Sequence, residues 1–173
     1  MFKKSLFILL FTCLSNFAFG QIQEWASGFR IGEPGGFMAR KYLSNGINAV
    51  EVNIGAYGGL WGTDRNYKDG TFKNIGFTMN ALYLWHHPTL VNSDIHTYYG
   101  FGPQYTSRDL YTKGSTTPTN NGGFGAAAVG GIEFYPVDAP NLSFFGEIGF
   151  YNEIAPNPFF FHVQGGIGVR VNF

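Results

Sequence analysis

The last fifteen residues, 159–173, alternate between two kinds of side chain with a period of two. One set is apolar throughout: Phe159, Phe161, Val163, Gly165, Ile167, Val169, Val171 and Phe173. The other set is mostly small or polar and includes Arg170. Successive strand side chains point to opposite faces, so the pattern predicts a strand with one apolar and one polar face. Such a strand, longer than the roughly six residues typical of soluble strands, is typical of a wall between lipid and a polar lumen.

The same alternation recurs along the chain between turn and loop signals. We expect strands at residues 24–32, 36–43, 47–61, 72–87, 94–106, 123–136, 143–154 and 159–173, and no helix after residue 20. The long polar segments 62–71 and 107–122 follow the third and fifth of these strands and therefore emerge at the same end. An even number of strands with loops of unequal length at the two ends predicts an all-β chain, an eight-stranded antiparallel up-and-down transmembrane β-barrel.

A cleavable signal peptide is expected at residues 1–20, before a single barrel domain at residues 21–173. Lys3 and Lys4 precede an apolar run, and Ala18-Phe19-Gly20 is a small-x-small cleavage site. The run is shorter than the roughly 20 apolar residues of a membrane-spanning helix. Cys13, the only cysteine, lies in this segment, so we expect a mature chain without disulfides or cysteine metal sites.

A soluble lipocalin-like barrel or a sandwich is the alternative fold. Its apolar face would point inward and its polar face outward. Gly and Ala crowd the polar faces of the first, sixth and last strands, and the apolar faces carry hardly any charge. A soluble fold would lack both a bulky core and a charged coat, which favours the membrane barrel. The mature chain has a net charge of −2, so no basic surplus points to a nucleic-acid partner.

Ionisable residues fall on the polar face of several expected strands. We predict a lumen charge network of three basic and three acidic residues: Arg30, Lys41, Glu51, Glu133, Glu147 and Arg170. Buried charges must be paired, so the network would close a narrow lumen; the alternative is a proton or ion path through a narrow pore. The register of 36–43 stays open, because placing Lys41 inward sends Arg40 outward to the membrane interface.

Two weaker patterns could carry chemistry. His162 and Glu153 should lie close together near one rim, where Ser107 or Ser115 could complete a hydrolase or acyltransferase site. No G-x-S-x-G motif supports such a site, so a hydrogen-bonded lumen histidine is the simpler interpretation.

His86 and His96 are candidate metal ligands beside the turn at 88–93. The neighbours His86 and His87 must point to opposite faces of a strand, so at most one of them can join His96 from inside. We therefore expect no metal and no other cofactor.

Several segments resemble one protein family: residues 28–32, 36–43 and 48–51, residues 131–134 with the following PVDAPNL turn, and the tail GGIGVRVNF. They are similar to the small outer-membrane β-barrel proteins of the Bacteroidetes type, with an OmpA/OmpX-like barrel architecture. The resemblance implies export to the outer membrane of a Gram-negative bacterium and contact with its lipid and lipopolysaccharide. It also implies assembly by the barrel-assembly machinery, which reads the terminal Phe173. We expect a monomer.

The resemblance says less about activity, because most members have none assigned. It implies a structural or surface role, with 62–71 and 107–122 as the recognition surface. The alternative is a lipid A-modifying enzyme of the deacylase or acyltransferase type that uses His162 and Glu153. The lipid A deacylases carry His-x-Ser on a late strand, whereas Val163 and Gln164 follow His162 here, which counts against that activity.

Overall fold

The computed structural model describes residues 24–173 except 44–45, 59–64, 69, 74 and 90–91, so the expected signal peptide lies outside the described residues. No helix in the described part is long and apolar enough to cross a membrane.

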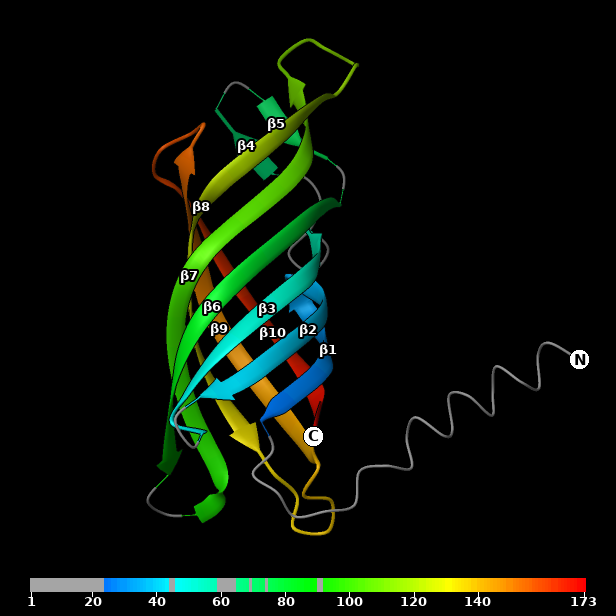
Figure 1. Cartoon of the computed structure of the whole chain (residues 1–173). Helices are drawn as coiled ribbons and strands as arrows, with labels where there is room; N and C mark the ends of the chain where they lie inside the picture. The colour runs from blue at the N-terminus through cyan, green and yellow to red at the C-terminus, as the bar shows by residue number, and fades with distance from the viewer. Residues whose placement is uncertain (1–23, 44–45, 59–64, 69, 74, 90–91) are drawn as a thin grey trace, which may run out of the picture.

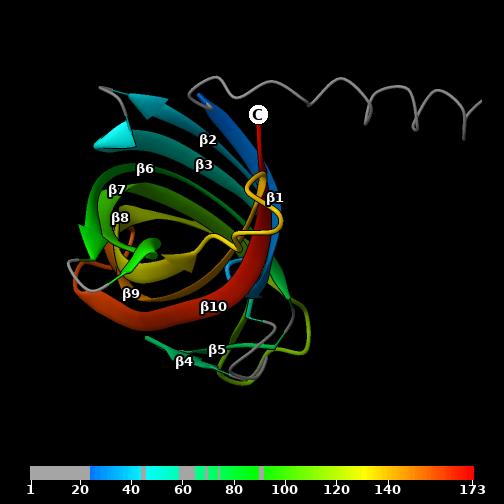
Figure 2. The same ribbon diagram turned by 90° about the horizontal axis from the view of Figure 1, so that it is seen from below.

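Strands dominate the described chain. The wall is built from β1 (Trp25–Glu33), β2 (Gly35–Leu43), β3 (Asn48–Tyr57), β6 (Gly76–Thr89), β7 (Asn92–Thr112), β8 (Thr119–Phe134), β9 (Leu142–Ala155) and β10 (Phe160–Asn172). Each pairs antiparallel with the next, and β1 pairs with β10, so these eight described strands close into a barrel, as predicted (Figures 1 and 2). Reciprocal backbone bonds of 2.9 and 2.8 Å join Trp25 to Phe173 at the seam.

A short hairpin lies at one end of the barrel, which we call the hairpin end; the opposite end, with Trp25 and Phe173, is the terminal end (Figure 1). The hairpin pairs β4 (Arg65–Tyr67) with β5 (Gly70–Phe72), and Phe72 of β5 pairs with Leu110 of β7.

The expectation that 62–71 and 107–122 are loops is therefore wrong over much of their length. β4 and β5 occupy part of the first segment, while β7 and β8 run to Thr112 and from Thr119. Phe72, expected to begin the fourth strand, belongs to β5, and β6 begins at Gly76. The sequence of these strand segments does not alternate between apolar and polar residues. A strand shows that alternation only where one of its faces is apolar and the other polar, so strands with two polar faces are missed. Both segments do emerge at the same end.

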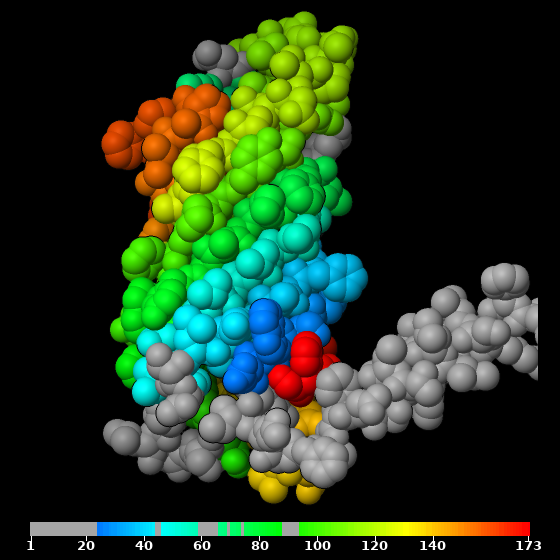
Figure 3. All heavy atoms as spheres, in the orientation of Figure 1, coloured from blue at the N-terminus to red at the C-terminus, as the bar shows by residue number. Residues whose placement is uncertain are grey.

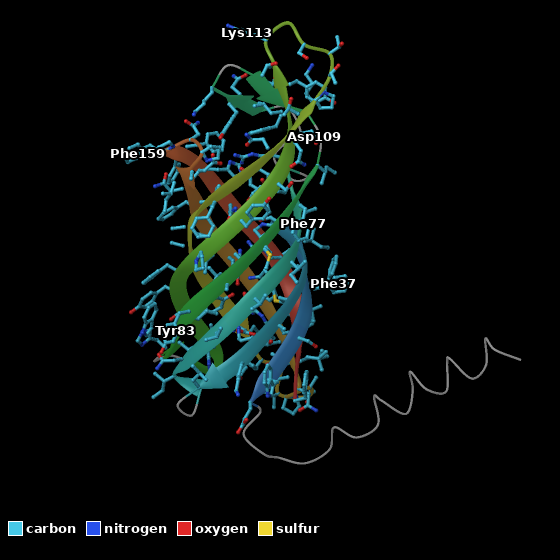
Figure 4. The ribbon with its side chains drawn as sticks, turned by 45° about the horizontal axis from the view of Figure 1, so that its top comes forward. Phe37, Phe77, Tyr83, Asp109, Lys113 and Phe159 are labelled. Atoms are coloured by element: carbon cyan, nitrogen blue, oxygen red, sulfur yellow. The ribbon has the colours of Figure 1, made fainter. Side chains whose placement is uncertain are left out.

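The barrel wall is apolar on its outside. Phe37, Ile148 and Ile167 are 73%, 69% and 65% exposed, whereas Arg170 and Glu51 are fully buried inside. Phe37, Phe77 and Tyr83 project away from the wall in Figure 4. On the face shown in Figure 3, the oblique stripes of neighbouring strands lie side by side from the hairpin end to the terminal end.

Charged residues avoid the middle of this outer wall. Among the described residues, those outside the lumen lie in turns or near strand ends: Glu24, Lys41, Lys68, Lys73, Asp94, Asp109, Lys113 and Asp138. An apolar belt flanked by polar ends, around a polar interior, is the arrangement of a transmembrane β-barrel. Closure also leaves no open strand edge that would expose unpaired backbone groups to lipid.

Candidate functional site

The centre of the lumen holds six buried charged side chains, which we call the central ion cluster: Arg30, Arg40, Glu51, Glu133, Glu147 and Arg170. Arg170 of β10 lies 3.1 Å from carboxylate oxygens of three glutamates, those of Glu51, Glu133 and Glu147. Its guanidinium also lies 3.6 Å from the centre of the Phe145 ring. One arginine therefore joins strands β3, β8 and β9 across the barrel.

Arg40 and Arg30 complete the pairing of these charges. Arg40 donates from Nε to Glu51 Oε2 at 2.7 Å and from Nη1 to Glu133 Oε2 at 2.8 Å. Arg30 forms an ion pair with Glu147. Removing charges from water is costly, and the cost is offset only where pairing and hydrogen bonds are nearly complete. Three arginines against three glutamates match the buried charges one for one.

Lys41 is not part of the cluster, so its expected inward placement is wrong. The register puts Arg40 opposite Ala26 on the inner face and Lys41 opposite Trp25 on the outer face. The Lys41 ammonium lies 5.0 Å from the centre of the Trp25 ring. The pairing of β2 with β3 places Arg40 directly opposite Glu51.

A second ion pair, which sequence reasoning missed, lies at the hairpin end. Arg108 of β7 pairs with Glu153 of β9, and the Tyr67 hydroxyl of β4 donates to Glu153 Oε1. The Arg108 guanidinium lies 4.1 Å from the Phe72 ring centre and 5.2 Å from that of Phe160. We call these five residues the outer cluster. Burial, with the bond to Glu153, raises the pKa of Tyr67 to about 12.

Glu33, rather than Glu153, is the carboxylate hydrogen-bonded to His162. The distance from His162 Nε2 to Glu33 Oε1 is 3.0 Å. Glu153 lies opposite Phe160 in the register and so is a diagonal neighbour of His162 on the same face, but its carboxylate binds Arg108 and Tyr67.

The two candidate nucleophiles have other partners. Ser107 Oγ donates to Asn120 Oδ1 at 3.4 Å, and Ser115 Oγ donates to the Thr117 carbonyl at 3.0 Å. These hydrogen bonds and ion pairs therefore do not join His162, Glu153 and the serines into a serine–histidine–carboxylate site.

The structure gives the other histidines different surroundings. His86 is buried, with Nε2 3.0 Å from Arg40 Nη1, whereas His87 is exposed and stacks on Tyr99 at 5.7 Å. His96 lies beside the Tyr135 ring at 5.0 Å. The described residues contain no group of three or more His, Cys, Asp or Glu side chains that could hold a metal ion.

Comparison with known proteins yields a fold and no family. No family model matches the sequence, and no curated protein matches it. Among solved structures, the N-terminal β-barrel domain of Pseudomonas aeruginosa OprF has a TM-score of 0.65 at 13% identity, covering 87% of this chain and 98% of that domain. Ail, the attachment invasion locus protein of Yersinia pestis, is similar at a TM-score of 0.44 and 15% identity, covering 86% and 93%.

The class that geometry and comparison define is an eight-stranded antiparallel transmembrane β-barrel. The likeness to the OprF domain concerns the fold alone.

Proposed function

We propose that this protein is a non-catalytic β-barrel of the outer membrane of a Gram-negative bacterium, of the small Bacteroidetes type. The proposal rests on the two faces of the barrel wall. Among the described residues, the middle of the outer face is apolar and carries no charge, whereas the inner face carries the ion pairs. A barrel exposing such a belt to water would carry an apolar patch far larger than soluble monomers tolerate. Outer-membrane lipid and lipopolysaccharide are the surroundings that fit this belt.

The central ion cluster supports a closed lumen rather than a conducting pore. Its arginines and glutamates contact one another directly across the lumen, from β1 to β9, from β2 to β8 and from β3 to β10. An eight-stranded interior is only wide enough for side chains to fill. The charged groups therefore act as a plug, and recognition is left to the hairpin end, where β4–β5 and the tip of β7–β8 rise above the wall.

Phe173 is the proposed contact for the barrel-assembly machinery. It is 44% exposed and continues the outward row of Val171 at the end of β10. We expect Phe173→Ala to lower the amount of assembled barrel in the membrane without changing the stability of molecules refolded in detergent.

Cell fractionation combined with heat-modifiable gel migration tests the location and the fold. The proposal requires the protein in the outer-membrane fraction and a folded band that shifts on boiling. Recovery in a soluble fraction would overturn it.

Two further measurements address activity. Mass spectrometry of lipid A from cells with the wild-type gene, without it, or with His162→Ala should give the same acyl pattern in all three; a change that depends on His162 would establish the enzyme alternative. Planar bilayers containing purified protein should stay silent, and steady ion current would establish the pore alternative.

A further inference from the structure

The outer wall carries two adjoining hollows where β8, β9, β10 and β1 meet. The first, of about 430 Å³, is lined on the outer face by Ala128, Gly130, Ile148, Phe150, Phe161 and Val163. The second, of about 420 Å³, is lined there by Ile31, Ile148, Val163, Gly165 and Ile167. Both volumes fall within the range of ~300–1,000 Å³ that is usual for ligand pockets. Because Ile148 and Val163 line both hollows, the two lie side by side on the wall.

Glycines on either side of one isoleucine shape these hollows. Gly130 of β8 pairs with Ile148 of β9, which pairs in turn with Gly165 of β10. Ile148 protrudes, at 69% exposed, whereas a Cβ added at Gly130 would meet no atom within 4 Å. The first hollow extends from Ile148 toward β8 and the second toward β1. Two slender chains that pass on either side of Ile148 fit this shape better than a broad protein surface does.

The hollows are continuous with the lipid-facing belt and offer it only apolar side chains. Glu147 also lines the second hollow, but its side chain is 0% exposed and pairs with Arg30 inside the lumen. The stacked rings of Phe150 and Phe161, 5.3 Å apart, border the first hollow. Association within lipid depends on van der Waals packing, which small residues improve by allowing close approach. An acyl chain in either hollow therefore gains more contacts than one that passes a smooth wall.

A basic side chain lies at the hairpin end of the same strands. Lys68, between β4 and β5, is exposed, and its Nζ donates at 3.3 Å to the carbonyl of Pro156 in the turn from β9 to β10. A lysine ammonium carries three donors, so this bond leaves donors for a phosphate. Phe159 in the same turn is 87% exposed and points away from the barrel (Figure 4). Aromatic and basic side chains at the end of an apolar belt are typical of the lipid head-group level.

The longer segments of an outer-membrane barrel face the cell exterior, so the hairpin end belongs to the leaflet that holds lipopolysaccharide. We propose that this face binds one lipopolysaccharide molecule through its lipid A part. Two neighbouring acyl chains lie in the hollows on either side of Ile148, and a phosphate of the sugar head meets Lys68. The identity of the lipid rests on the proposed function, whereas the position of the site rests on the hollows and on Lys68.

Native mass spectrometry of protein refolded in detergent with purified lipid A tests the hollows. Wild type should retain one lipid A molecule, and Gly130→Leu, which fills the first hollow without a clash, should retain it several-fold less often. Ala39→Leu is the matched control, because Ala39 is exposed on β2 and lines neither hollow. Heat-modifiable migration shows that each variant is folded. Equal retention by wild type and Gly130→Leu would overturn the site.

Lys68→Gln tests the head group, since it changes a turn residue outside the wall. It should lower retention of lipid A several-fold and leave retention of lipid A stripped of its phosphates unchanged. An equal loss with both lipids would overturn the phosphate contact. Dioleoylphosphatidylglycerol, an anionic lipid with two chains, should displace lipid A poorly, and displacement at equal concentration would overturn the assignment to lipopolysaccharide. These outcomes are independent of the cell fractionation that tests the location, because refolded protein is used.

Discussion

The central ion cluster and the outer cluster both hold fully buried arginines, but the partners of those arginines come from different kinds of element. In the central cluster every contact joins strands of the barrel wall, and Arg170 alone reaches three glutamates. In the outer cluster Arg108 has one glutamate, and aromatic side chains of the β4–β5 hairpin supply much of its remaining surroundings. The central cluster is therefore inseparable from barrel closure, whereas the outer cluster also fastens a separate hairpin to the wall.

This difference predicts a gradient of stability along the barrel axis. Breaking the central cluster should destabilise the whole barrel. Breaking the outer cluster should mainly release β4–β5, because that hairpin pairs with the wall through the short β5–β7 ladder alone among the described strands.

Arg170→Met should have the largest effect. It leaves Glu51, Glu133 and Glu147 with one arginine fewer, and breaking a buried ion pair by removing one partner costs about 3–5 kcal/mol. Urea unfolding in detergent micelles, followed by heat-modifiable migration, measures the loss. The outward Val171→Met is the matched control on the same strand and should retain wild-type stability. Wild-type stability in Arg170→Met would show that the central cluster does not hold the barrel together.

Glu153→Gln should lower the free energy of unfolding by less, about 2 kcal/mol, which is the value of a hydrogen bond to a charged group. Arg108 would lose its carboxylate but keep the flanking rings of Phe72 and Phe160. The same substitution at Glu133, which contacts both Arg40 and Arg170, is the direct comparison and should cost more. If both substitutions lowered the free energy of unfolding equally, the central ion cluster would contribute no more to barrel stability than the outer cluster.

Tyr67→Phe should act on the hairpin alone. It removes the hydrogen bond to the charged Glu153 and keeps the ring against Phe160, a local loss of about 1.5 kcal/mol. Limited proteolysis should cut within residues 65–72 faster in the variant, while the urea midpoint of the barrel stays close to wild type. A matching fall in the midpoint would show that hairpin and wall unfold together.

The pKa of Tyr67 gives this bond a pH dependence. Because the folded pKa is raised to about 12, the bond contributes fully below about pH 10, the ordinary tyrosine pKa, and is lost as pH rises through about 12. The difference in tyrosinate absorbance between wild type and Tyr67→Phe measures this titration. A difference that appears near pH 10 would contradict the burial of the hydroxyl.

The two clusters also differ in how far the sequence predicts them. Alternation places Arg30, Glu51, Glu133, Glu147 and Arg170 on inner faces, because a wall between lipid and lumen forces a period of two. Alternation does not predict the inward position of Arg108, because this residue lies in a Thr- and Asn-rich segment where both faces of a strand can be polar. It does not predict the hairpin either, since β4 and β5 are too short for a periodic pattern.

Lys41 shows that alternation alone does not always predict which face of a wall strand a residue occupies. In β2 the apolar and charged residues fit either face, so the register depends on the pairing across the turn, which sets Arg40 against Glu51. Guanidinium groups suit this position, because their fixed fork of donors can bind two carboxylates at once.

Lys41→Ala should therefore have the smallest effect, leaving the unfolding midpoint at the wild-type value. The ammonium is exposed and contacts the outward Trp25 ring, so no buried carboxylate loses a partner. Arg40→Ala, one residue away on the inner face, should instead destabilise the barrel strongly, because Glu51 and Glu133 each lose a direct contact. If Lys41→Ala proved as damaging as Arg40→Ala, β2 would have the opposite register, with lysine inside and arginine at the membrane surface.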